Sequence, residues 1–230
     1  MIKVGIILTP DNRSKAYIQK ITNKKIKLEE IIFMNDNRSE QKYSAEAIDE
    51  SKRCGFDISE PVSETLKKQQ LDYVEFNFVD INHPQLIKFL EKSKTNYFIY
   101  TGGGILKNPV LRTGSKFIHF HPGIVPKYRG STCFYYSIIN DDKCGVTAYF
   151  MDEKLDTGDI IFQKNFPKPE NEFIDEVYDS HIRSETLLEV IKNNLIGNKN
   201  LKKQNPSEGE NYFIIHPVLK HIAILSCIKK

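Results

Sequence analysis

Residues 116–132 read Lys-Phe-Ile-His-Phe-His-Pro-Gly-Ile-Val-Pro-Lys-Tyr-Arg-Gly-Ser-Thr, and residues 151–159 read Met-Asp-Glu-Lys-Leu-Asp-Thr-Gly-Asp. In the first stretch, His119 and His121 are two positions apart in a run of β-forming residues. Because side chains alternate along a strand, we expect both imidazoles on the same face. The Pro-Gly pair that follows ends the strand and leaves His121 at its carboxyl end, where α/β sheets bind ligands. In the second stretch, the Thr-Gly after Asp156 predicts a turn that directs this carboxylate back to an imidazole.

Strand-like segments on either side of these stretches alternate with helix-like segments. The strand-like segments cover residues 3–9, 26–33, 73–78, 97–100, 117–120, 146–151 and 160–164, and the helix-like segments cover 15–22, 44–52, 62–70, 84–92, 131–140 (capped by Ser131) and 171–195. This alternation predicts an α/β fold with a mostly parallel twisted sheet and helices on both faces. Residues 35–61 are polar with few large aliphatic side chains, and we expect them to form a mobile excursion.

The composition is typical of a soluble globular protein. Of the residues, 40% are hydrophobic and 27% are charged. The length of 230 residues is that of one large α/β domain. The net charge of +3 is too small to predict nucleic-acid binding by itself. The four cysteines have no CxxC spacing, which favours free thiols in a reducing cytoplasm. No apolar run approaches the ~18 residues of a membrane span, so we expect a cytoplasmic protein without a membrane segment.

Two chemistries fit the His119/His121 pair. Two imidazoles on one face of a strand are half of a common zinc site, and a metal-dependent hydrolase would take further ligands from Asp156, His216 or His221. In the other chemistry no metal is needed, because Asp156 accepts a hydrogen bond from His121 and favours its protonated form. The imidazole can then take a proton from an amine and polarise the carbonyl group that the amine attacks. The residue types alone leave both chemistries open.

Three motifs together resemble the catalytic core of the folate-dependent formyltransferases. They are His-Pro-Gly-Ile-Val-Pro-Lys-Tyr-Arg-Gly from residue 121, Gly-Val-Thr-Ala-Tyr-Phe-Met-Asp from residue 145 and Leu-Asp-Thr-Gly-Asp-Ile-Ile from residue 155. This family includes glycinamide ribonucleotide formyltransferase, methionyl-tRNA formyltransferase and the sugar N-formyltransferases. The resemblance is specific over residues 97–165, and elsewhere it follows the order of elements. It implies a Rossmann-like domain that moves a formyl group from its co-substrate, 10-formyltetrahydrofolate, to an amine without a metal ion.

The resemblance also implies the roles of single residues. His121 would be the catalytic histidine and Asp156 the catalytic aspartate, while His119 stands where the family has an asparagine whose amide donates to the formyl oxygen. An imidazole N–H could donate from the same place, but an imidazole is bulkier and titratable. The folate would lie between two walls, formed by Gly103, Gly104, Ile105 and Leu106 and by Met151, Asp152 and Leu155. Four residues are expected on the acceptor side: Tyr128, Arg129, Tyr212 and His216.

The C-terminal part of the chain narrows the expected acceptor. We expect a formyltransferase catalytic domain over residues 1–196 and a short substrate-side extension over residues 197–230, without the β-barrel that helps methionyl-tRNA formyltransferase to grip tRNA. The extension is similar to that of the sugar formyltransferases. The expected acceptor is therefore an amino sugar of surface-glycan synthesis, either nucleotide-linked or of the nonulosonic-acid type, and not a nucleic acid. A homodimer is compatible with the sequence. The alternative is a non-catalytic folate- or sugar-binding module that lost turnover through His119.

Overall fold

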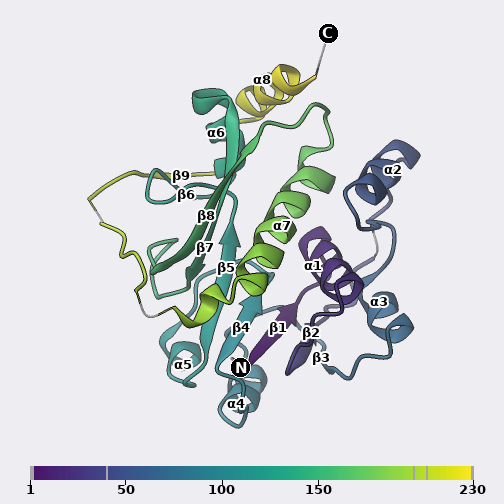
Figure 1. Cartoon of the computed structure of the whole chain (residues 1–230), viewed down its shortest axis with the longest axis vertical. Coiled ribbons are helices and arrows are strands. Elements are labelled where there is room, and N and C mark those ends of the chain that lie inside the picture. Colours follow the sequence, from purple (N-terminus) through teal and green to yellow (C-terminus); the bar gives the residue numbers. More distant parts are fainter. Residues whose placement is uncertain (1–2, 40, 199, 206, 229–230) are drawn as a thin grey trace.

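The core of the molecule is one mixed sheet with helices on both faces (Figure 1). The structure, a computed structural model, describes residues 3–39, 41–198, 200–205 and 207–228. Within these residues, seven strands form the sheet in the order β3-β2-β1-β4-β5-β7-β8. Their bounds are β1 Val4–Leu8, β2 Ile31–Met34, β3 Val74–Phe76, β4 Tyr97–Tyr100, β5 Lys116–His121, β7 Lys143–Phe150 and β8 Ile160–Pro167. The strands from β3 to β5 pair in parallel, whereas β7 and β8 run antiparallel at one edge. The predicted fold class, an α/β fold with a mostly parallel sheet, is confirmed.

The helices begin where the sequence supplies caps. The Asp11 side chain accepts a hydrogen bond from the Ser14 backbone at the start of the first helix, and Ser44 does the same for Ala47 at the second. The bounds are α1 Asn12–Asn23, α2 Ala45–Arg53, α3 Val62–Lys68, α4 Pro84–Leu90, α5 Asn108–Leu111, α6 Cys133–Asp141, α7 Asp179–Lys192 and α8 Pro217–Cys227. A second small sheet pairs β6 Tyr128–Gly130 with β9 Glu210–Tyr212 in parallel.

Two apolar cores lie on opposite faces of the main sheet. The larger core contains α1, α2, α3, α6, α7 and α8, and within it α1 and α7 pack side by side (Figure 1). The smaller core contains α4 and α5. Strand β5 alternates between the two: Ile118 and Phe120 face the larger core, and Phe117 faces the smaller one. By this alternation His119 and His121 continue the side of Phe117, as the sequence predicts.

Strand register brings the two histidines to the ligand-binding edge of the sheet. The last paired residues of β4 and β5 are Ile99 and Ile118, so β5 continues past the carboxyl end of its parallel neighbour. The neighbours β1 and β4 lie where the strand order changes direction, the position at which α/β sheets bind ligands. Thr101 ties the ends of these two strands together, because its Oγ1 accepts a hydrogen bond from the Thr9 backbone N–H at 3.1 Å, and the same oxygen lies 2.6 Å from Ser14 Oγ of α1.

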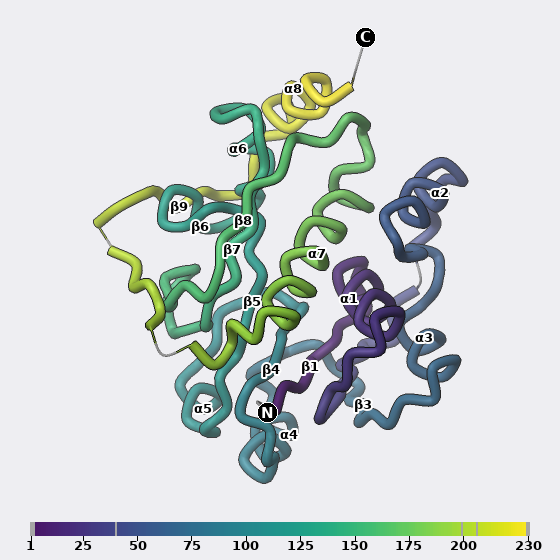
Figure 2. Tube along the Cα trace, viewed as in Figure 1, coloured from purple at the N-terminus to yellow at the C-terminus, as the bar shows by residue number. Residues whose placement is uncertain are grey.

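The C-terminal segment wraps around the antiparallel edge of the sheet. After α7 and a short turn at Leu195–Gly197, the chain passes β8, and Ile160 forms a bridge with Lys202. It then reaches β9 beside β6 and ends in α8, which packs against α6 (Figure 2). The described part of residues 197–230 therefore packs against the preceding residues along its length.

Two local expectations are wrong. Ser131 does not cap the helix that follows, because Thr132 occupies the cap position with φ of 52° and no side-chain cap hydrogen bond. The Thr132 hydroxyl instead accepts from the Ile215 backbone, which secures the C-terminal segment. The helix expected over residues 171–195 is shorter: it begins with a wide turn at Ile174–Tyr178, which leads directly into α7, and the Asn171 side chain before it accepts a hydrogen bond from the Phe173 backbone N–H.

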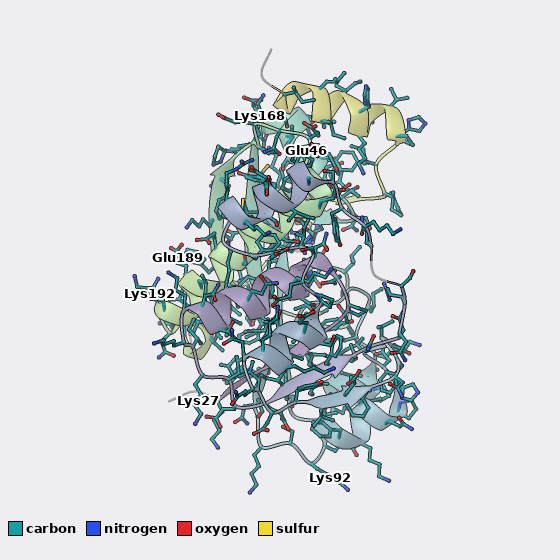
Figure 3. The ribbon with its side chains drawn as sticks, turned by 90° about the vertical axis from the view of Figure 1, so that its right-hand side faces the viewer. Lys27, Glu46, Lys92, Lys168, Glu189 and Lys192 are labelled. Carbon is teal, nitrogen blue, oxygen red and sulfur yellow. The ribbon has the colours of Figure 1, made fainter. Side chains whose placement is uncertain are left out.

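Charged side chains are spread over the outside of the molecule. Figure 3 labels Lys92 and Lys168 at opposite ends, with Lys27 and Lys192 between them. Among the residues that the structure describes, no helix is long and apolar enough to span a bilayer.

Gly158 provides a test of the turn that joins β7 to β8. A Cβ atom at this position would lie 1.6 Å from the Phe150 carbonyl oxygen, so the backbone of the turn would have to move. We expect Gly158→Ala to lower the free energy of unfolding by about 2 kcal/mol or more, measured by urea denaturation.

Gly103→Ala is the matched control, because a Cβ atom there has no neighbour within 4 Å. We expect its free energy of unfolding to change by less than about 1 kcal/mol. An equal loss in both variants would show that the close packing at Gly158 does not matter.

Candidate active site

A cavity of about 370 Å³ beside α1 and a second of about 550 Å³ at the carboxyl end of β5 share Arg13 in their linings. The second cavity contains the predicted histidines and Asp156, and we call it the catalytic cavity. Its lining is drawn from β5, β6, β7, α1, α7 and five loops: Arg13, Gly103, Gly104, Ile105, His119, His121, Pro122, Gly130, Ser131, Thr132, Tyr149, Met151, Leu155, Asp156, Arg183 and Ile214.

His121 and Asp156 form a buried pair. Nδ1 of His121 lies 3.4 Å from Oδ2 of Asp156, and their side chains are 3% and 9% exposed. His121 is the last residue of β5 and pairs across the sheet with Thr147 of β7. The Thr147 hydroxyl donates to the Gly123 carbonyl at 2.6 Å, which secures the Pro-Gly loop directly after the histidine. The turn of residues 156–158 thus directs the carboxylate to the imidazole, as the sequence predicts.

Asp156 is held from three sides. Tyr149 Oη donates to Oδ1 at 2.6 Å, and the Gly130 backbone N–H donates to Oδ2 at 2.7 Å. The Gln204 side chain donates to the carbonyl groups of Asp156 and Gly158, so the C-terminal segment also secures the turn. Asp156 itself adopts the left-handed region, with φ of 53°, which aspartate tolerates better than most residues. These contacts leave the carboxylate one orientation.

The hydrogen bond at the far side of the His121 ring determines its tautomer. Nε2 lies 2.9 Å from the Tyr128 carbonyl oxygen, which can only accept, so Nε2 carries a proton. Nδ1 is then the nitrogen that can gain or lose a proton beside Asp156. Gly123 permits this arrangement, because a Cβ atom there would lie 2.8 Å from both Nε2 of His121 and the Tyr128 oxygen.

His119 is oriented in the opposite sense. Its Nδ1 lies 3.3 Å from the carbonyl oxygen of Tyr100, the last residue of β4, and must donate to it. Across the sheet His119 faces Tyr149, and their rings meet edge to face with centroids 6.0 Å apart. In the neutral tautomer Nε2 is therefore a hydrogen-bond acceptor. The expected donation from His119 to a substrate oxygen through Nε2 requires a second proton on this ring.

Burial and neighbouring charges set the protonation of the three groups. Burial lowers the pKa of His119 well below its usual value, and Arg183 and Arg13 lower it further. Burial also lowers the pKa of His121, although Asp156 acts in the opposite direction. Burial acts to raise the pKa of Asp156, but the charge of His121 and the Tyr149 hydrogen bond outweigh it, so this pKa is lowered. At neutral pH the cavity thus holds an ionised carboxylate and two neutral imidazoles.

This arrangement can accept one proton at a fixed point. In neutral His121, Nδ1 lies 3.4 Å from Oδ2 of Asp156, and the charge of a proton gained by the ring would be stabilised by this carboxylate. The pair is therefore a general base whose protonated form is stabilised by the adjacent carboxylate. Such a pair serves reactions in which a nucleophile loses a proton.

The residues expected at the folate walls divide into two groups. Gly103, Gly104 and Ile105 line the catalytic cavity from one side, and Met151 and Leu155 line it as well. Leu106 and Asp152 do not line it. Leu106 is 1% exposed within the core against α4 and α5, and the Asp152 carboxylate accepts from the Thr157 hydroxyl.

The four residues expected on the acceptor side lie outside the lining of the catalytic cavity. Tyr128 is buried, and its ring packs against that of Tyr212 with centroids 5.4 Å apart. Arg129 is also buried, and its Nη2 donates to the Glu208 carbonyl. His216 is exposed and caps α8. These residues hold the C-terminal segment beside the cavity.

The structure does not assemble the metal site that the His-x-His pattern suggests. His216 and His221 lie at and on α8, and neither lines the catalytic cavity. Across residues 3–39, 41–198, 200–205 and 207–228, no group of three or more His, Cys, Asp and Glu side chains could hold a metal ion.

Several lining residues were not predicted as site residues, among them Tyr149, Arg13 and Arg183. Tyr149 could have been found by pairing residues 146–151 against residues 117–120, because Tyr149 then lies opposite His119. Arg13 and Arg183 come from α1 and α7, and no local pattern in either helix distinguishes them from surface arginines. Only the packing of these helices beside β5 brings them to the cavity.

Comparison with known proteins assigns this arrangement to one family. The family model described as Formyl transferase matches residues 13–191, more than half of the chain. Methionyl-tRNA formyltransferase of Ehrlichia canis (strain Jake) is 41% identical over 79 residues, which make up 33% of this chain and 26% of that protein. The chain covers less than half the length of the curated relatives it matches.

Two solved structures are similar over almost the whole chain. A sugar N-formyltransferase from Shewanella sp FDAARGOS_354 has a TM-score of 0.61 and 16% identity, covering 99% of this chain and 88% of that chain. An N-formyltransferase from Helicobacter canadensis, in complex with folinic acid and dTDP-3-aminofucose, has a TM-score of 0.58 and 18% identity, covering 92% and 71%. At these identities the likeness shows a shared fold.

The lowered pKa of His119 predicts how stability depends on pH. The unfolded chain protonates this histidine near pH 6.5, whereas the folded chain does so only at lower pH, so the unfolded state binds more protons in between. The contribution of neutral His119 to the free energy of unfolding is complete above about pH 6.5. It is lost as the pH falls through the folded-state pKa of this histidine. Between the pKa of the unfolded chain and that of the folded chain, each such imidazole lowers the free energy of unfolding by up to about 1.4 kcal/mol for each unit by which the pH falls.

Urea denaturation at pH 7.5, 6.5 and 5.5 measures this effect. His119→Asn keeps a hydrogen-bond donor and removes the titration, so its stability should fall less steeply below pH 6.5 than that of the wild type. Identical pH dependence in the two proteins would contradict a neutral buried His119.

Proposed function

The chain belongs to the formyl transferase family, and from this premise we propose that it is an N-formyltransferase that uses 10-formyltetrahydrofolate and formylates an amino sugar. One observation carries the proposal: a general-base pair, His121 and Asp156, is buried at the end of an open cavity that has a flat, apolar wall. A cytoplasmic role in surface-glycan synthesis accords with the free thiols of the described cysteines.

The wall formed by residues 103–105 suits a flat heterocycle. A Cβ atom added at Gly103 or Gly104 would have no neighbour within 4 Å, so the bare backbone is open to a ligand. Ile105 and Leu155 are 53% and 43% exposed although both are large and apolar. A pteridine ring between them would cover this surface, and 10-formyltetrahydrofolate would supply the formyl group.

The His121–Asp156 pair would move one proton during the transfer. As the acceptor amine bonds to the formyl carbon, Nδ1 of His121 takes the proton that the amine loses, and Asp156 stabilises the imidazolium. Nδ1 then returns this proton to the folate nitrogen that leaves the formyl carbon. The proton therefore moves from amine to leaving nitrogen, and the pair ends as it began.

His119 would act differently from the asparagine that it replaces. With Nδ1 bonded to the Tyr100 carbonyl, neutral His119 presents Nε2 as an acceptor, which can orient the N–H of an attacking amine. Donation to the developing oxyanion would follow only after this ring gains a proton. We propose that His119 orients the amine and that turnover survives the exchange of asparagine for histidine.

One finding supports an amino sugar as the acceptor. Sugar N-formyltransferases are among the solved structures with this fold: that from Shewanella is similar over 99% of this chain, and the N-formyltransferase of Helicobacter canadensis, solved with dTDP-3-aminofucose, over 92%.

A transfer assay tests the function. The protein is mixed with 10-formyltetrahydrofolate and a panel of 3-amino and 4-amino nucleotide sugars and amino nonulosonates, and mass spectrometry detects the formylated product. We expect acceptor-dependent turnover that Asp156→Asn reduces by at least about 100-fold with the fold intact, because the imidazolium loses its carboxylate. Folate binding without formylation of any amine would support the non-catalytic module instead.

Tyr149→Phe tests how the carboxylate is held. The variant removes the hydrogen bond to Oδ1 of Asp156 and leaves the Gly130 contact in place. Since a hydrogen bond to a charged group is worth about 1.5–3 kcal/mol, kcat should fall by about 10- to 100-fold with little change in the affinity for folate. Tyr97→Phe removes the same hydroxyl from a tyrosine that does not line the cavity, and it is the matched control. Equal kcat values in both variants would show that Tyr149 does not position Asp156.

A further inference from the structure

Two guanidinium groups line the catalytic cavity, and the proposed proton transfer uses neither. Arg13 lies on α1 and Arg183 on α7, two helices that pack side by side on one face of the sheet (Figure 1). The apolar wall is formed by other elements, namely the loop after β4 and the loop after β7. The cavity therefore has an apolar part that suits the folate and a cationic part on the two helices.

Arg183 is rigidly held and retains donor capacity. Its Nε donates to Asp179 at 2.8 Å, and Nη1 donates to the Phe120 carbonyl at 3.0 Å, so β5 and α7 both fix the guanidinium. The third nitrogen, Nη2, makes no hydrogen bond to any residue that the structure describes. Arg183 still reaches the cavity surface with 7% of its area. Buried guanidinium groups normally have all three nitrogens bonded, so Nη2 suits a ligand oxygen.

Arg13 adds further donors beside Arg183. Its Nη2 lies 3.2 Å from Asp11, and neither Nε nor Nη1 bonds to a residue in the described part of the chain. The side chain is 23% exposed. The two arginines act together on His119, whose pKa they lower by more than Asp156 raises it. At His119 the effect of the two arginines therefore outweighs that of Asp156.

The chemistry of the cluster favours a singly charged, planar anion. Two arginines and two aspartates, Asp11 and Asp179, have no net formal charge together, so a phosphate with a second charge would meet two nearby carboxylates. A carboxylate brings one negative charge and two coplanar oxygens, which match the fork of guanidinium donors. The cationic part of the cavity thus suits a carboxylate better than a diphosphate.

We propose that Arg183 and Arg13 bind a carboxylate of the acceptor, so that the acceptor is an acidic amino sugar of the amino-nonulosonate type. This inference rests on the proposed function and narrows it, because a nucleotide-linked sugar has its anion in the diphosphate. The two arginines hold the sugar acid so that its amine reaches Nε2 of His119 and the His121–Asp156 pair.

Calorimetry tests the inference without turnover. With 5-formyltetrahydrofolate bound, the dissociation constants of an amino nonulosonate, its primary carboxamide and a dTDP-linked 4-amino sugar are compared. The carboxamide removes the charge and preserves the shape. We expect the acid to bind about 10- to 100-fold more tightly than the carboxamide, the effect of a charge-assisted hydrogen bond. The dTDP-sugar should bind more weakly than the acid.

Variants identify the residues responsible. In Arg13→Gln the preference for the acid over the carboxamide should shrink to about threefold or less, and Arg183→Lys should reduce it while keeping the charge. Arg53→Gln makes the same charge change on α2, where Arg53 is 70% exposed and paired with Glu50, and should leave the preference unchanged. Thermal denaturation checks that each variant is folded. If Arg183→Lys does not fold, the result for Arg13→Gln decides.

The outcomes separate this inference from the proposed function. Equal affinity for acid and carboxamide, absence of acid binding, or a preference that Arg13→Gln leaves intact would overturn the carboxylate site. Formylation of a nucleotide sugar with no preference for the acid would overturn it and uphold the N-formyltransferase. Selective binding of the acid without formyl transfer would uphold the carboxylate site and remove the proposed reaction.

Discussion

The burial of one ionised carboxylate, Asp156, is the constraint on which the rest of the site depends. An unpaired buried charge would be costly, and this one is stabilised by an imidazole, a phenol and a backbone N–H. These partners come from β5, β7 and β6, and Gln204 in the C-terminal segment holds the same turn. Because every partner belongs to a different element, the carboxylate takes its position only when the antiparallel edge, the small sheet and the tail are all in place.

The same burial governs the protonation of the cavity. His119 and His121 lie in a dry environment, where the charged form of an imidazole is disfavoured, and Arg13 and Arg183 add positive charge beside His119. The cavity therefore favours neutral imidazoles and negative ligands. One electrostatic arrangement thus accounts both for a base that is free to take a proton and for the affinity for an anion that we infer.

Much of the fold could be predicted from the sequence, because it follows from local pattern. The strand 117–120, the turn after Asp156 and the alternation of strands with helices are visible in residue order, and the structure contains them. The wrong predictions concern side chains that have more than one possible hydrogen-bond partner. Ser131 was expected to cap α6, but tertiary contacts place Thr132 at the cap position and use its hydroxyl for the C-terminal segment. Tyr128 and Arg129, expected beside the acceptor, also contact that segment, and their role toward an acceptor stays a prediction.

By itself, the sequence determined the α/β class, the placement of His119 and His121 on one face of a strand end, and the motif that links His121 to Asp156. These features depend on residues that are close in sequence or on the period of a strand. Only the tertiary structure decided that Tyr149 and Gly130 secure the carboxylate, that each imidazole donates to a particular carbonyl, and that Arg13 and Arg183 meet at one cavity. Those contacts join residues from separate elements, and they exist because helix packing and strand register, which no local pattern encodes, bring the elements together.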